Sequence, residues 1–442
     1  MSKELSSHSA EIICAAMQIA IENKLIRWVV TLSATVLFLL AVGWITRTYV
    51  AGAYASRLSE ESLQRAIRLD PGNASYHLQL GGLYEYMPTE AQPEKAMLEF
   101  QRAAELSPYD PSVWINLGGA AEFSGHISEA EKYLREADYL APRIPMYQWR
   151  IANFYLLHGN VSEAFAHFNK VLAGTREYDQ AVFGTAWKAS GDAPQILQQL
   201  VPKDLPAEFS YLYFLVAAKR FSESADVWKR ILDTPGKFQP NEVNGYIENL
   251  VWNRRPEEAF EVWQDLQKKG LLRISAPKAD RDVITNGSFE DDLLNTGFTW
   301  RISPAEDVFA GLDTTNYHSA SHALLVLFSG KQNLDYRNVY QYVKVEPGKN
   351  YRLQAFLKAD RITTDSGPRL EVRDFYEPGA LDKFTDDVTG STESWSSVLL
   401  DFRTGPKTEL VAVILARLPS AKLDNQIAGK VWLDDVSLTP LP

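Results

Sequence analysis

Three hydrophobic patterns follow one another along the chain. Residues 28–45 form an uninterrupted apolar stretch, WVVTLSATVLFLLAVGWI, without a charged side chain. Between about residues 55 and 270, apolar positions recur with the period of amphipathic helices. After Arg281 they alternate with polar positions, as in half-buried β-strands. The pattern predicts a multidomain chain with an N-terminal transmembrane helix, an α-helical region and a C-terminal all-β region.

The apolar stretch is long enough to cross a membrane. Its 18 residues reach the length that spans a hydrocarbon core, and Trp28 and Trp44 lie at its ends, where amphipathic rings prefer the interface. A cleaved signal peptide is the alternative, but the stretch exceeds a usual signal-peptide core, and only the weak site AGAYA follows it. We therefore predict a tail over residues 1–27 and a retained transmembrane helix over residues 28–46. Two basic residues flank the stretch on each side, so charge does not set its orientation.

A helical repeat is recognisable in residues 111–142, PSVWINLGGAAEFSGHISEAEKYLREADYLAP. Small residues such as Gly118 and Ala121 let two antiparallel helices approach closely, and the larger Trp114 and Leu117 fill the space between neighbouring repeats. A proline then ends the second helix. This pattern resembles the tetratricopeptide repeat, position for position.

Neighbouring segments match the same pattern. Upstream, an insertion near residues 87–93, MPTEAQP, lengthens the turn between the two helices. The matching positions are Leu80, Gly81, Tyr84, Ala96, Phe100, Ala103 and Pro108 upstream, and Ile151, Ala152, Tyr155, Ala164 and Phe168 downstream. Later copies keep little beyond Ala225 and Ala259. We predict tetratricopeptide-type repeats over residues 55–270 and a linker over residues 271–281.

Repeats of this kind stack into a solenoid with a concave face. The resemblance implies that this face binds a peptide or protein partner. In the family's register, the expected contact residues of the second and third repeats are Ile115, Glu122, Met146, Trp149 and Asn153. Tryptophan is enriched at interface hot spots, which favours Trp149 as an anchor, and the alternative is that it packs against the next repeat.

The segment after Arg281 contains several strand patterns. Residues 338–359, NVYQYVKVEPGKNYRLQAFLKA, alternate on both sides of EPGKN, which predicts a β-hairpin there. ALLVLF, WSSVLLDFRT, ELVAVILARL and GKVWLDDVSL are typical of further strands. Short strands at near-regular spacing predict an all-β sandwich over residues 282–442.

An ordered set of segments in this region, NGSFED, TGFTW, YQYVKVEPGKNYRLQAFLKA, TESWSSVLLDF and VWLDDVSL, resembles the jelly-roll carbohydrate-binding modules with a galactose-binding-like fold. The resemblance covers residues 283–438. It implies that Glu290 and either Asp434 or Asp435 hold a structural calcium ion, since this hard cation prefers several oxygen ligands. The alternative is that the aspartates only end a strand.

Sugar recognition needs flat aromatic faces together with planar polar groups. The candidates for glycan contact are Trp300, Tyr317, Tyr340, Tyr342, Tyr376 and Trp395, with Phe375 in the same pool. Tyr340 and Tyr342 lie on one face of their strand, because side chains two residues apart point to the same side. The pattern leaves open whether that face is core or cleft.

Composition excludes several classes of function. The chain of 442 residues is 45% hydrophobic, as in globular proteins, and its net charge of -11 comes without a basic tract, so no nucleic-acid partner is expected. Cys14 is the single cysteine, so no intramolecular disulfide forms. No phosphate-binding loop, nucleophile elbow or metalloprotease helix is present in the sequence. A carboxylate pair for glycoside hydrolysis among Glu371, Asp374 and Glu377 is an alternative that spacing alone does not support. We predict that the chain is not an enzyme and needs no cofactor besides calcium.

Two hypotheses from different classes follow. In the first, the chain is a scaffold anchored in a bacterial inner membrane, whose repeats bind a protein and whose sandwich binds polysaccharide, in exopolysaccharide assembly or export. In the second, the chain is purely structural and its sandwich contacts only protein. We expect the N-terminus inside and residues 48–442 outside, because a short tail precedes the apolar stretch and a carbohydrate-type module lies at the far end.

Overall fold

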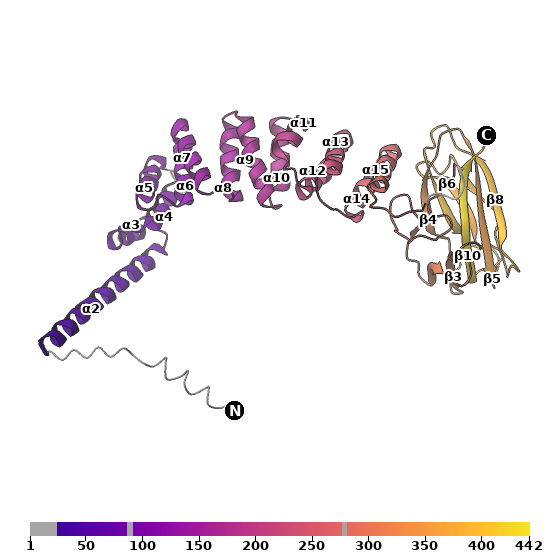
Figure 1. The fold of residues 1–442 in the computed structure, drawn as a ribbon, viewed down its shortest axis with the longest axis horizontal. Helices are drawn as coiled ribbons and strands as arrows, with labels where there is room; N and C mark the ends of the chain where they lie inside the picture. Colours follow the sequence, from indigo (N-terminus) through magenta and orange to yellow (C-terminus); the bar gives the residue numbers. More distant parts are fainter. Residues whose placement is uncertain (1–23, 86–91, 276–280) are drawn as a thin grey trace, which may run out of the picture. The chain divides into compact units, whose positions relative to one another are not determined.

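The computed structural model describes residues 24–85, 92–275 and 281–442, and the chain divides into two compact units, Met1–Pro202 and Lys203–Pro442 (Figure 1). The single cysteine, most of the predicted tail, most of the insertion MPTEAQP and residues 276–280 of the predicted linker lie outside the described residues.

The first described helix, α2 (Lys24–Ala55), is 32 residues long and contains the whole apolar stretch. By length and composition it is able to cross a membrane, either as a retained anchor or as a signal sequence, and none of its most apolar segment is buried. The helix runs beyond residue 46, because no proline interrupts TRTYVAGAYA. Its last turns pack on α3 (Glu60–Leu69), where Ala51 and Ala55 are buried.

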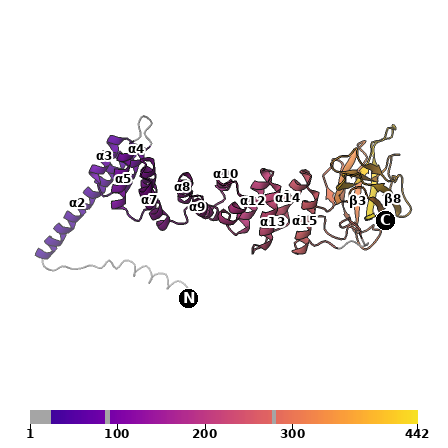
Figure 2. The same cartoon turned by 90° about the horizontal axis from the view of Figure 1, so that it is seen from above.

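Pairs of consecutive helices make up the rest of the helical region. In the first unit they are α4 (Ala74–Glu85), α5 (Pro93–Leu106), α6 (Pro111–Phe123), α7 (Ile127–Leu140), α8 (Pro145–Leu157), α9 (Val161–Gly174), α10 (Asp179–Ala189), α11 (Ala193–Gln195) and the π-helix η1 (Ile196–Leu200). The second unit begins with α12 (Leu205–Ala217), α13 (Phe221–Asp233), α14 (Asn241–Trp252) and α15 (Pro256–Lys268). Figure 2 shows the helices following one another within each unit.

Sequence signals set the helix ends. The carboxylate of Asp110 accepts a hydrogen bond from the Ser112 amide at 2.9 Å, and Pro111 occupies the first turn of α6, where a missing N–H leaves no bond unmade. Asn160 and Asp204 cap α9 and α12 in the same way. The positions of these polar caps therefore define where the helices begin, which the apolar pattern alone does not.

Small residues lie where the repeat pattern places them. A Cβ atom on Gly118 of α6 would lie 2.7 Å from Leu134 Cδ2 of α7, so only glycine lets these helices approach so closely. Gly81 of α4 faces Phe100 of α5 in the same manner. The repeat register read from the sequence is correct for both pairs.

The rest of the second unit is an antiparallel β-sandwich, as predicted. Its strands are β1 (Arg301–Ile302), β2 (Val308–Asp313), β3 (Ala323–Ser329), β4 (Tyr336–Lys344), β5 (Asn350–Asp360), β6 (Arg369–Asp374), β7 (Asp382–Phe384), β8 (Ser396–Arg403), β9 (Leu410–Arg417) and β10 (Ala428–Pro440). Sheet A has the order β1–β4–β9–β6–β7 and sheet B the order β2–β3–β10–β5–β8. Val339 and Val343 of β4 and Val431 and Leu433 of β10 are among the core residues between the two sheets, and alternate residues form the outer faces.

The predicted hairpin around EPGKN is wrong. The strands on either side of it lie in different sheets, because β4 pairs with β1 and β9, whereas β5 pairs with β10 and β8. The turn crosses from one layer to the other, and the Glu346 amide donates a hydrogen bond to the Tyr351 hydroxyl at 2.9 Å. A hairpin within one sheet and a turn that crosses between two sheets both contain alternating strands and turn residues. The local sequence pattern therefore does not identify which strand pairs with which.

Candidate functional site

A groove lies on the first unit between α6 and α8. It encloses about 600 Å³ and is lined by Ser112, Ile115, Asn116, Met146, Tyr147, Trp149, Arg150 and Asn153. Four of the five residues predicted to contact a protein partner are in this set. The fifth, Glu122, is not, and its carboxylate lies 3.0 Å from Nε2 of His158.

The groove combines a buried apolar floor with an exposed apolar rim. Ile115 is only 5% exposed, whereas Met146 is 59% exposed. The Trp149 indole stacks on the ring of Tyr178, the N-cap residue of α10, with centroids 5.6 Å apart, and it also lines the groove. The Asn153 side-chain amide donates to the Trp149 carbonyl at 2.7 Å, which fixes this side of the groove.

Arg150 is the charged residue of the groove. Its guanidinium lies against Gly119, where even a Cβ atom would overlap with it, and 3.6 Å from the Glu85 carboxylate. Burial raises the pKa of the Glu85 carboxyl, although Arg150 acts in the opposite direction. The prediction from the sequence missed Arg150, because it included only concave positions about one turn apart along α8. Arg150, the residue directly after Trp149, also lines the groove.

The carboxylate of Glu290, predicted to bind calcium, accepts hydrogen bonds from the loop before β3. The amide and hydroxyl groups of Ser321 donate to it at 3.0 and 2.6 Å, and the His322 amide donates at 2.9 Å. Burial would raise the pKa of Glu290, but the hydrogen bonds from Ser321 and His322 prevail and lower it to about 2.

The aspartates of β10 contact the same loop. Asp434 accepts hydrogen bonds from the amides of His318 and Ser319 at 2.7 and 3.1 Å, and burial raises its pKa. The Asp435 carboxylate lies 2.6 Å from Nδ1 of His318. Asp435 has a positive φ of 44°, at the irregularity where the pairing of β10 with β5 shifts register.

These contacts bear on the calcium prediction. N–H and O–H donors engage the oxygens that a calcium ion needs, and within the described part of the chain no group of three or more His, Cys, Asp or Glu side chains is placed to hold a metal. As the side chains lie here, the donor set of Glu290, Asp434 and Asp435 does not fit calcium. Calcium binding by these residues stays a prediction that a melting experiment tests.

Three of the aromatics predicted to contact glycan differ widely in exposure. Trp300 is fully buried and donates a hydrogen bond from Nε1 to the Asn286 carbonyl at 3.1 Å, so its ring has no open face. Tyr317 is 43% exposed. Trp395 is half-buried and meets His318 edge-on with centroids 5.7 Å apart.

Helix α14 covers part of the outer face of sheet A and the loop after β6. The Tyr376 hydroxyl donates a hydrogen bond to the Val251 carbonyl at 2.8 Å. The rings of Phe375 and Trp252 meet edge-on with centroids 5.1 Å apart. These two predicted glycan-contacting aromatics therefore pack against the helical region.

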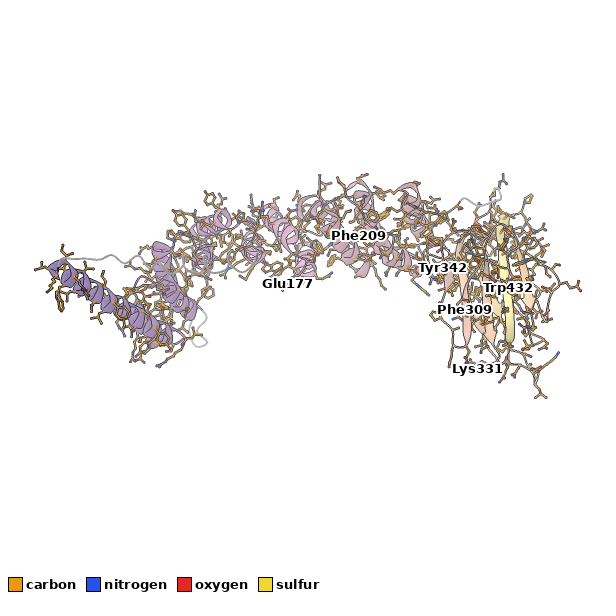
Figure 3. All side chains as sticks on the ribbon, turned by 60° about the horizontal axis from the view of Figure 1, so that its bottom comes forward. Glu177, Phe209, Phe309, Lys331, Tyr342 and Trp432 are labelled. Carbon is orange, nitrogen blue, oxygen red and sulfur yellow. The ribbon has the colours of Figure 1, made fainter. Side chains whose placement is uncertain are left out.

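Tyr342 (Figure 3) lies on the same outer face and is 7% exposed. The guanidinium of Arg301 lies 4.5 Å from the Tyr342 ring centroid and forms an ion pair with Glu248 of α14. Lys344, two residues further along β4, forms an ion pair with Glu257 of α15 at 2.5 Å. Tyr340 is half-buried beside Tyr342 and is the more accessible of the two.

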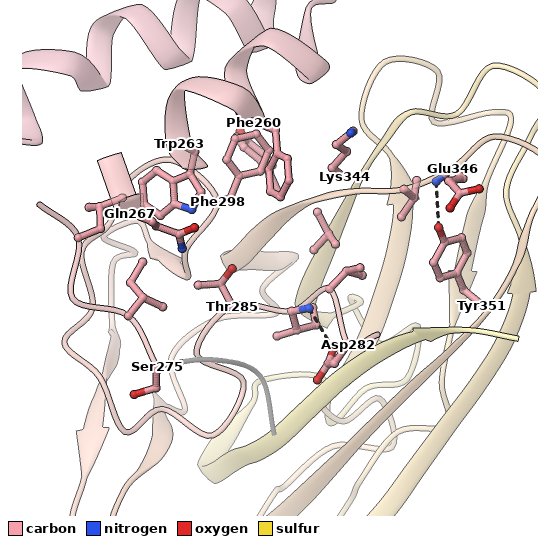
Figure 4. Close-up of a pocket in the computed structure, with 17 residues that line it drawn as sticks. Phe260, Trp263, Gln267, Ser275, Asp282, Thr285, Phe298, Lys344, Glu346 and Tyr351 are labelled. Atoms are coloured by element: carbon pink, nitrogen blue, oxygen red, sulfur yellow. Dashed lines mark hydrogen bonds between the residues drawn. The ribbon is translucent and has the colours of Figure 1, made fainter. Parts of the chain in front are cut away.

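A cavity of about 640 Å³ lies between α15 and the sandwich (Figure 4). Phe260 and Trp263 of α15 and Phe298 of the sandwich line it with aromatic surface. A half-buried acid of its lining, Asp282, accepts a hydrogen bond from the Leu438 amide at 2.9 Å, and desolvation raises the pKa of Asp282. The helix and the sandwich thus share an aromatic junction, and the carboxylate of Asp282 is engaged there by backbone amides of the sandwich.

The carboxylates considered for glycoside hydrolysis are engaged in ion pairs and hydrogen bonds within the protein. Glu371 is fully buried and lies 2.7 Å from Nε of Arg337. Asp374 accepts hydrogen bonds from two amides of the loop that follows it, at 2.8 and 2.7 Å. Glu377 forms an ion pair with Arg254 of the α14–α15 turn at 3.4 Å.

Comparison with known proteins finds similarities for two regions of the chain, the helical repeats and the sandwich. Residues 111–144, which contain α6 and α7, match the tetratricopeptide repeat family. No curated protein matches the chain. Among solved structures, the chain is similar to a tetratricopeptide repeat protein from Parabacteroides merdae, with 14% identity over 51% of this chain and 93% of that chain, at a TM-score of 0.30.

Two other solved structures are similar to the chain. One is a family 4 carbohydrate-binding module, CBM4, with 19% identity over 36% of this chain and 99% of that chain, at a TM-score of 0.26. The other is the enzymatically active domain of tailspike protein 4 of bacteriophage CBA120, with 16% identity over 36% of this chain and a TM-score of 0.26. The similarity spans 22% of the tailspike chain. The chain carries a tetratricopeptide-repeat region followed by a C-terminal antiparallel β-sandwich that resembles carbohydrate-binding modules.

Proposed function

We propose that the chain is a non-catalytic scaffold, anchored in a bacterial inner membrane by α2, with both units outside the cytoplasm. The groove of the repeats binds a segment of a protein partner and the sandwich binds glycan, in the assembly or export of exopolysaccharide. The exposed apolar α2, the groove between α6 and α8, and the structural use of the candidate hydrolytic carboxylates support this proposal.

The groove is the observation that carries the proposal. Met146 and Trp149 provide apolar contacts, Asn116 provides a side-chain amide, and Arg150 provides a guanidinium. An apolar surface with a few converging polar groups is the usual form of a binding site. An extended peptide with an apolar side chain next to an acidic group matches this set, because arginine binds carboxylates in a planar, paired geometry.

A peptide library tests this function. The full chain in nanodiscs is titrated into fluorescent extended peptides that vary one apolar and one acidic position, and polarisation is measured. Met146→Glu places a charge at the exposed rim, and Leu157→Glu places the same charge on the same helix, where the side chain is 77% exposed and outside the groove. We expect Met146→Glu to weaken binding of the best peptide by tenfold or more and Leu157→Glu to leave it unchanged. Equal affinities for the two variants would contradict the proposal.

A purely structural chain, whose sandwich binds no sugar, is the second candidate. The observation that favours it is that Phe375 and Tyr376 pack on α14 while Tyr342 is only 7% exposed, which leaves these aromatics little open surface for a sugar. A glycan array probed with the full chain separates the two candidates. Saturable binding to any glycan would contradict the structural candidate, and absence of binding would contradict the glycan part of the proposal.

A further inference from the structure

The outer face of sheet B carries aromatic, aliphatic and cationic side chains in register. Strand pairing places Trp432 of β10 between Leu325 of β3 and Lys358 of β5. In the next row, Lys430 of β10 pairs with Leu327 of β3. The sequence neighbours of these residues belong to the core, so the side chains themselves lie on the face directed away from it.

Phe309 extends the second row onto the edge strand β2, where it pairs with Leu327. A Cβ atom on Gly311 would lie 3.0 Å from Phe309 Cζ, so the phenyl ring lies over this glycine and along the sheet. Phe309 is 56% exposed and Leu327 is 38% exposed, and Figure 3 labels Phe309 and Trp432 on this part of the sandwich. The edge of sheet B thus presents a flat apolar platform to solvent.

Two lysines beside this platform have no carboxylate partner among the described residues. The ammonium groups of Lys358 and Lys430 each lie 5.9 Å from the Trp432 ring centroid, and neither forms an ion pair with a carboxylate of the described residues. The acids nearest in the strand pairing are engaged elsewhere. Asp360, the cross-strand neighbour of Lys430, pairs with the arginine that follows it, and Asp313 accepts a hydrogen bond from Trp432 Nε1 at 2.6 Å.

We infer that this face binds an acidic glycan, namely a polysaccharide whose pyranose rings carry carboxylates. The C–H face of a sugar ring packs on Phe309 and Leu327, and a ring carboxylate accepts charge-assisted hydrogen bonds from Lys430 and Lys358. The inference rests on the proposed function, in which the sandwich binds glycan, and adds to it the surface and the class of substrate.

Local charge and shape favour this occupant. The net charge of -11 on the whole chain repels polyanions at long range, so an acidic polymer needs a local site of positive charge, which Lys358 and Lys430 beside Trp432 provide. The apolar side chains lie along the sheet and form a flat surface, which suits sugar rings. Insertion into a lipid surface instead requires apolar side chains that bury into the acyl boundary.

The test uses matched ligands and matched variants. The ligands are oligogalacturonate, oligomannuronate and oligoglucuronate, each compared with its carboxyl-reduced form, which keeps the rings and linkages and loses the charge. The full chain in nanodiscs of neutral lipid is titrated by calorimetry at low and physiological salt. The test variant combines Lys358→Gln with Lys430→Gln, and the control combines Lys383→Gln with Lys407→Gln, two exposed lysines away from this face. Phe309→Ser tests the platform.

We expect at least one acidic oligosaccharide to bind about tenfold more tightly than its reduced form at low salt. Lys358→Gln with Lys430→Gln removes this preference and leaves the affinity for the reduced form unchanged, whereas the control pair has no effect. Phe309→Ser weakens binding of both forms, because it removes apolar contact rather than charge. Physiological salt reduces the preference, since the two ammonium groups are near solvent.

The contrary outcomes are distinguishable. Unchanged acidic binding in the test variant, or preference for the reduced form, would overturn the inference and leave glycan binding by the sandwich intact. Absence of binding to every ligand here and on the glycan array would overturn both. Binding to vesicles with anionic lipid, or to an acidic peptide, that depends on Lys358 and Lys430 while no oligosaccharide binds would assign the face to that partner and overturn the inference.

Discussion

Replacement of Gly118 by leucine tests the packing of the repeats most sharply. Gly118 lies where α6 meets α7, and an added Cβ atom would lie 2.7 Å from Leu134 Cδ2 and 2.8 Å from Leu134 Cγ. Such distances are below ordinary van der Waals contact, so a leucine at this position forces the two helices apart or moves Leu134 out of its rotamer.

The magnitude follows from two opposing effects. Overpacking a close-packed position costs about 1–3 kcal/mol, whereas removal of a glycine from a helix interior stabilises by about 0.5–1 kcal/mol. At Gly82 of α4, nothing lies within 4 Å of an added Cβ atom, so only the second effect operates there. At Gly118 the two effects oppose each other, so we expect Gly118→Leu to lower the free energy of unfolding of the repeats by about 0.5–2 kcal/mol, and Gly82→Ala to raise it by about 0.5–1 kcal/mol.

Thermal melting of the full chain in detergent, followed by circular dichroism at a helix band, measures both variants. A difference of 1 kcal/mol corresponds to about 2–4 °C in Tm for a region of this size. Hydrogen exchange should show the loss of protection in α6 and α7 and in the neighbouring pairs, because repeats depend on their neighbours. If Gly118→Leu melts at or above the temperature of the parent chain, the close helix contact and the repeat register are both refuted.

Four further predictions concern the sandwich and the membrane helix. Glu290 has a pKa lowered to about 2, so its carboxylate stabilises the fold above the unfolded pKa of about 4.3 and loses this effect as the pH falls through 2; Glu290→Gln should lower Tm at pH 7, with the difference vanishing near pH 2. Tyr376→Phe removes the hydrogen bond to the Val251 carbonyl and should cost about 1 kcal/mol, seen as faster hydrogen exchange at the end of α14. The calcium prediction requires a Tm several degrees higher in millimolar calcium than in chelator, and equal curves would refute it. Protease added to spheroplasts should degrade residues 48–442, and their complete protection would contradict the proposed orientation.

Helix packing could be read from the sequence because it depends on residue size at fixed spacing. Gly118 and Leu134 stand at repeat positions where close approach demands a small side chain opposite a large one, and the structure places them in contact. Part of the groove lining was also predictable from the sequence, because Met146 and Trp149 lie about one turn apart on the same helix. Arg150 was missed because the register followed Met146, Trp149 and Asn153 only, and the packing of the Arg150 guanidinium on Gly119 is not visible in the spacing.

Strand positions were predictable, but strand partners and the covering of sheet faces were not. The alternation of β4 and β5 is the same whether EPGKN closes a hairpin or crosses between layers. Tyr342 alternates as an outward residue, yet it is nearly closed, because Arg301 lies over it and pairs with Glu248 of α14. The burial of Tyr342 thus depends on a segment that is distant in the sequence, and the local pattern of β4 does not predict it.

The outer face of sheet B left a weak signal in the sequence. Lys430 and Trp432 are two residues apart, which places them on one face of β10, but the segment also reads as an ordinary terminal strand. Only the register of β2, β3 and β5 shows that Phe309, Leu327 and Lys358 join that face.

Site-specific photo-crosslinking in cells tests the central claim, that the groove between α6 and α8 binds a protein partner. A photoreactive amino acid replaces Met146 at the groove rim in one strain and Leu157 on the same helix in another, and both side chains are exposed. The account predicts a discrete crosslinked product from position 146 that Arg150→Gln diminishes, and no such product from position 157. Absence of a product at position 146, or the same product from both positions, would contradict it.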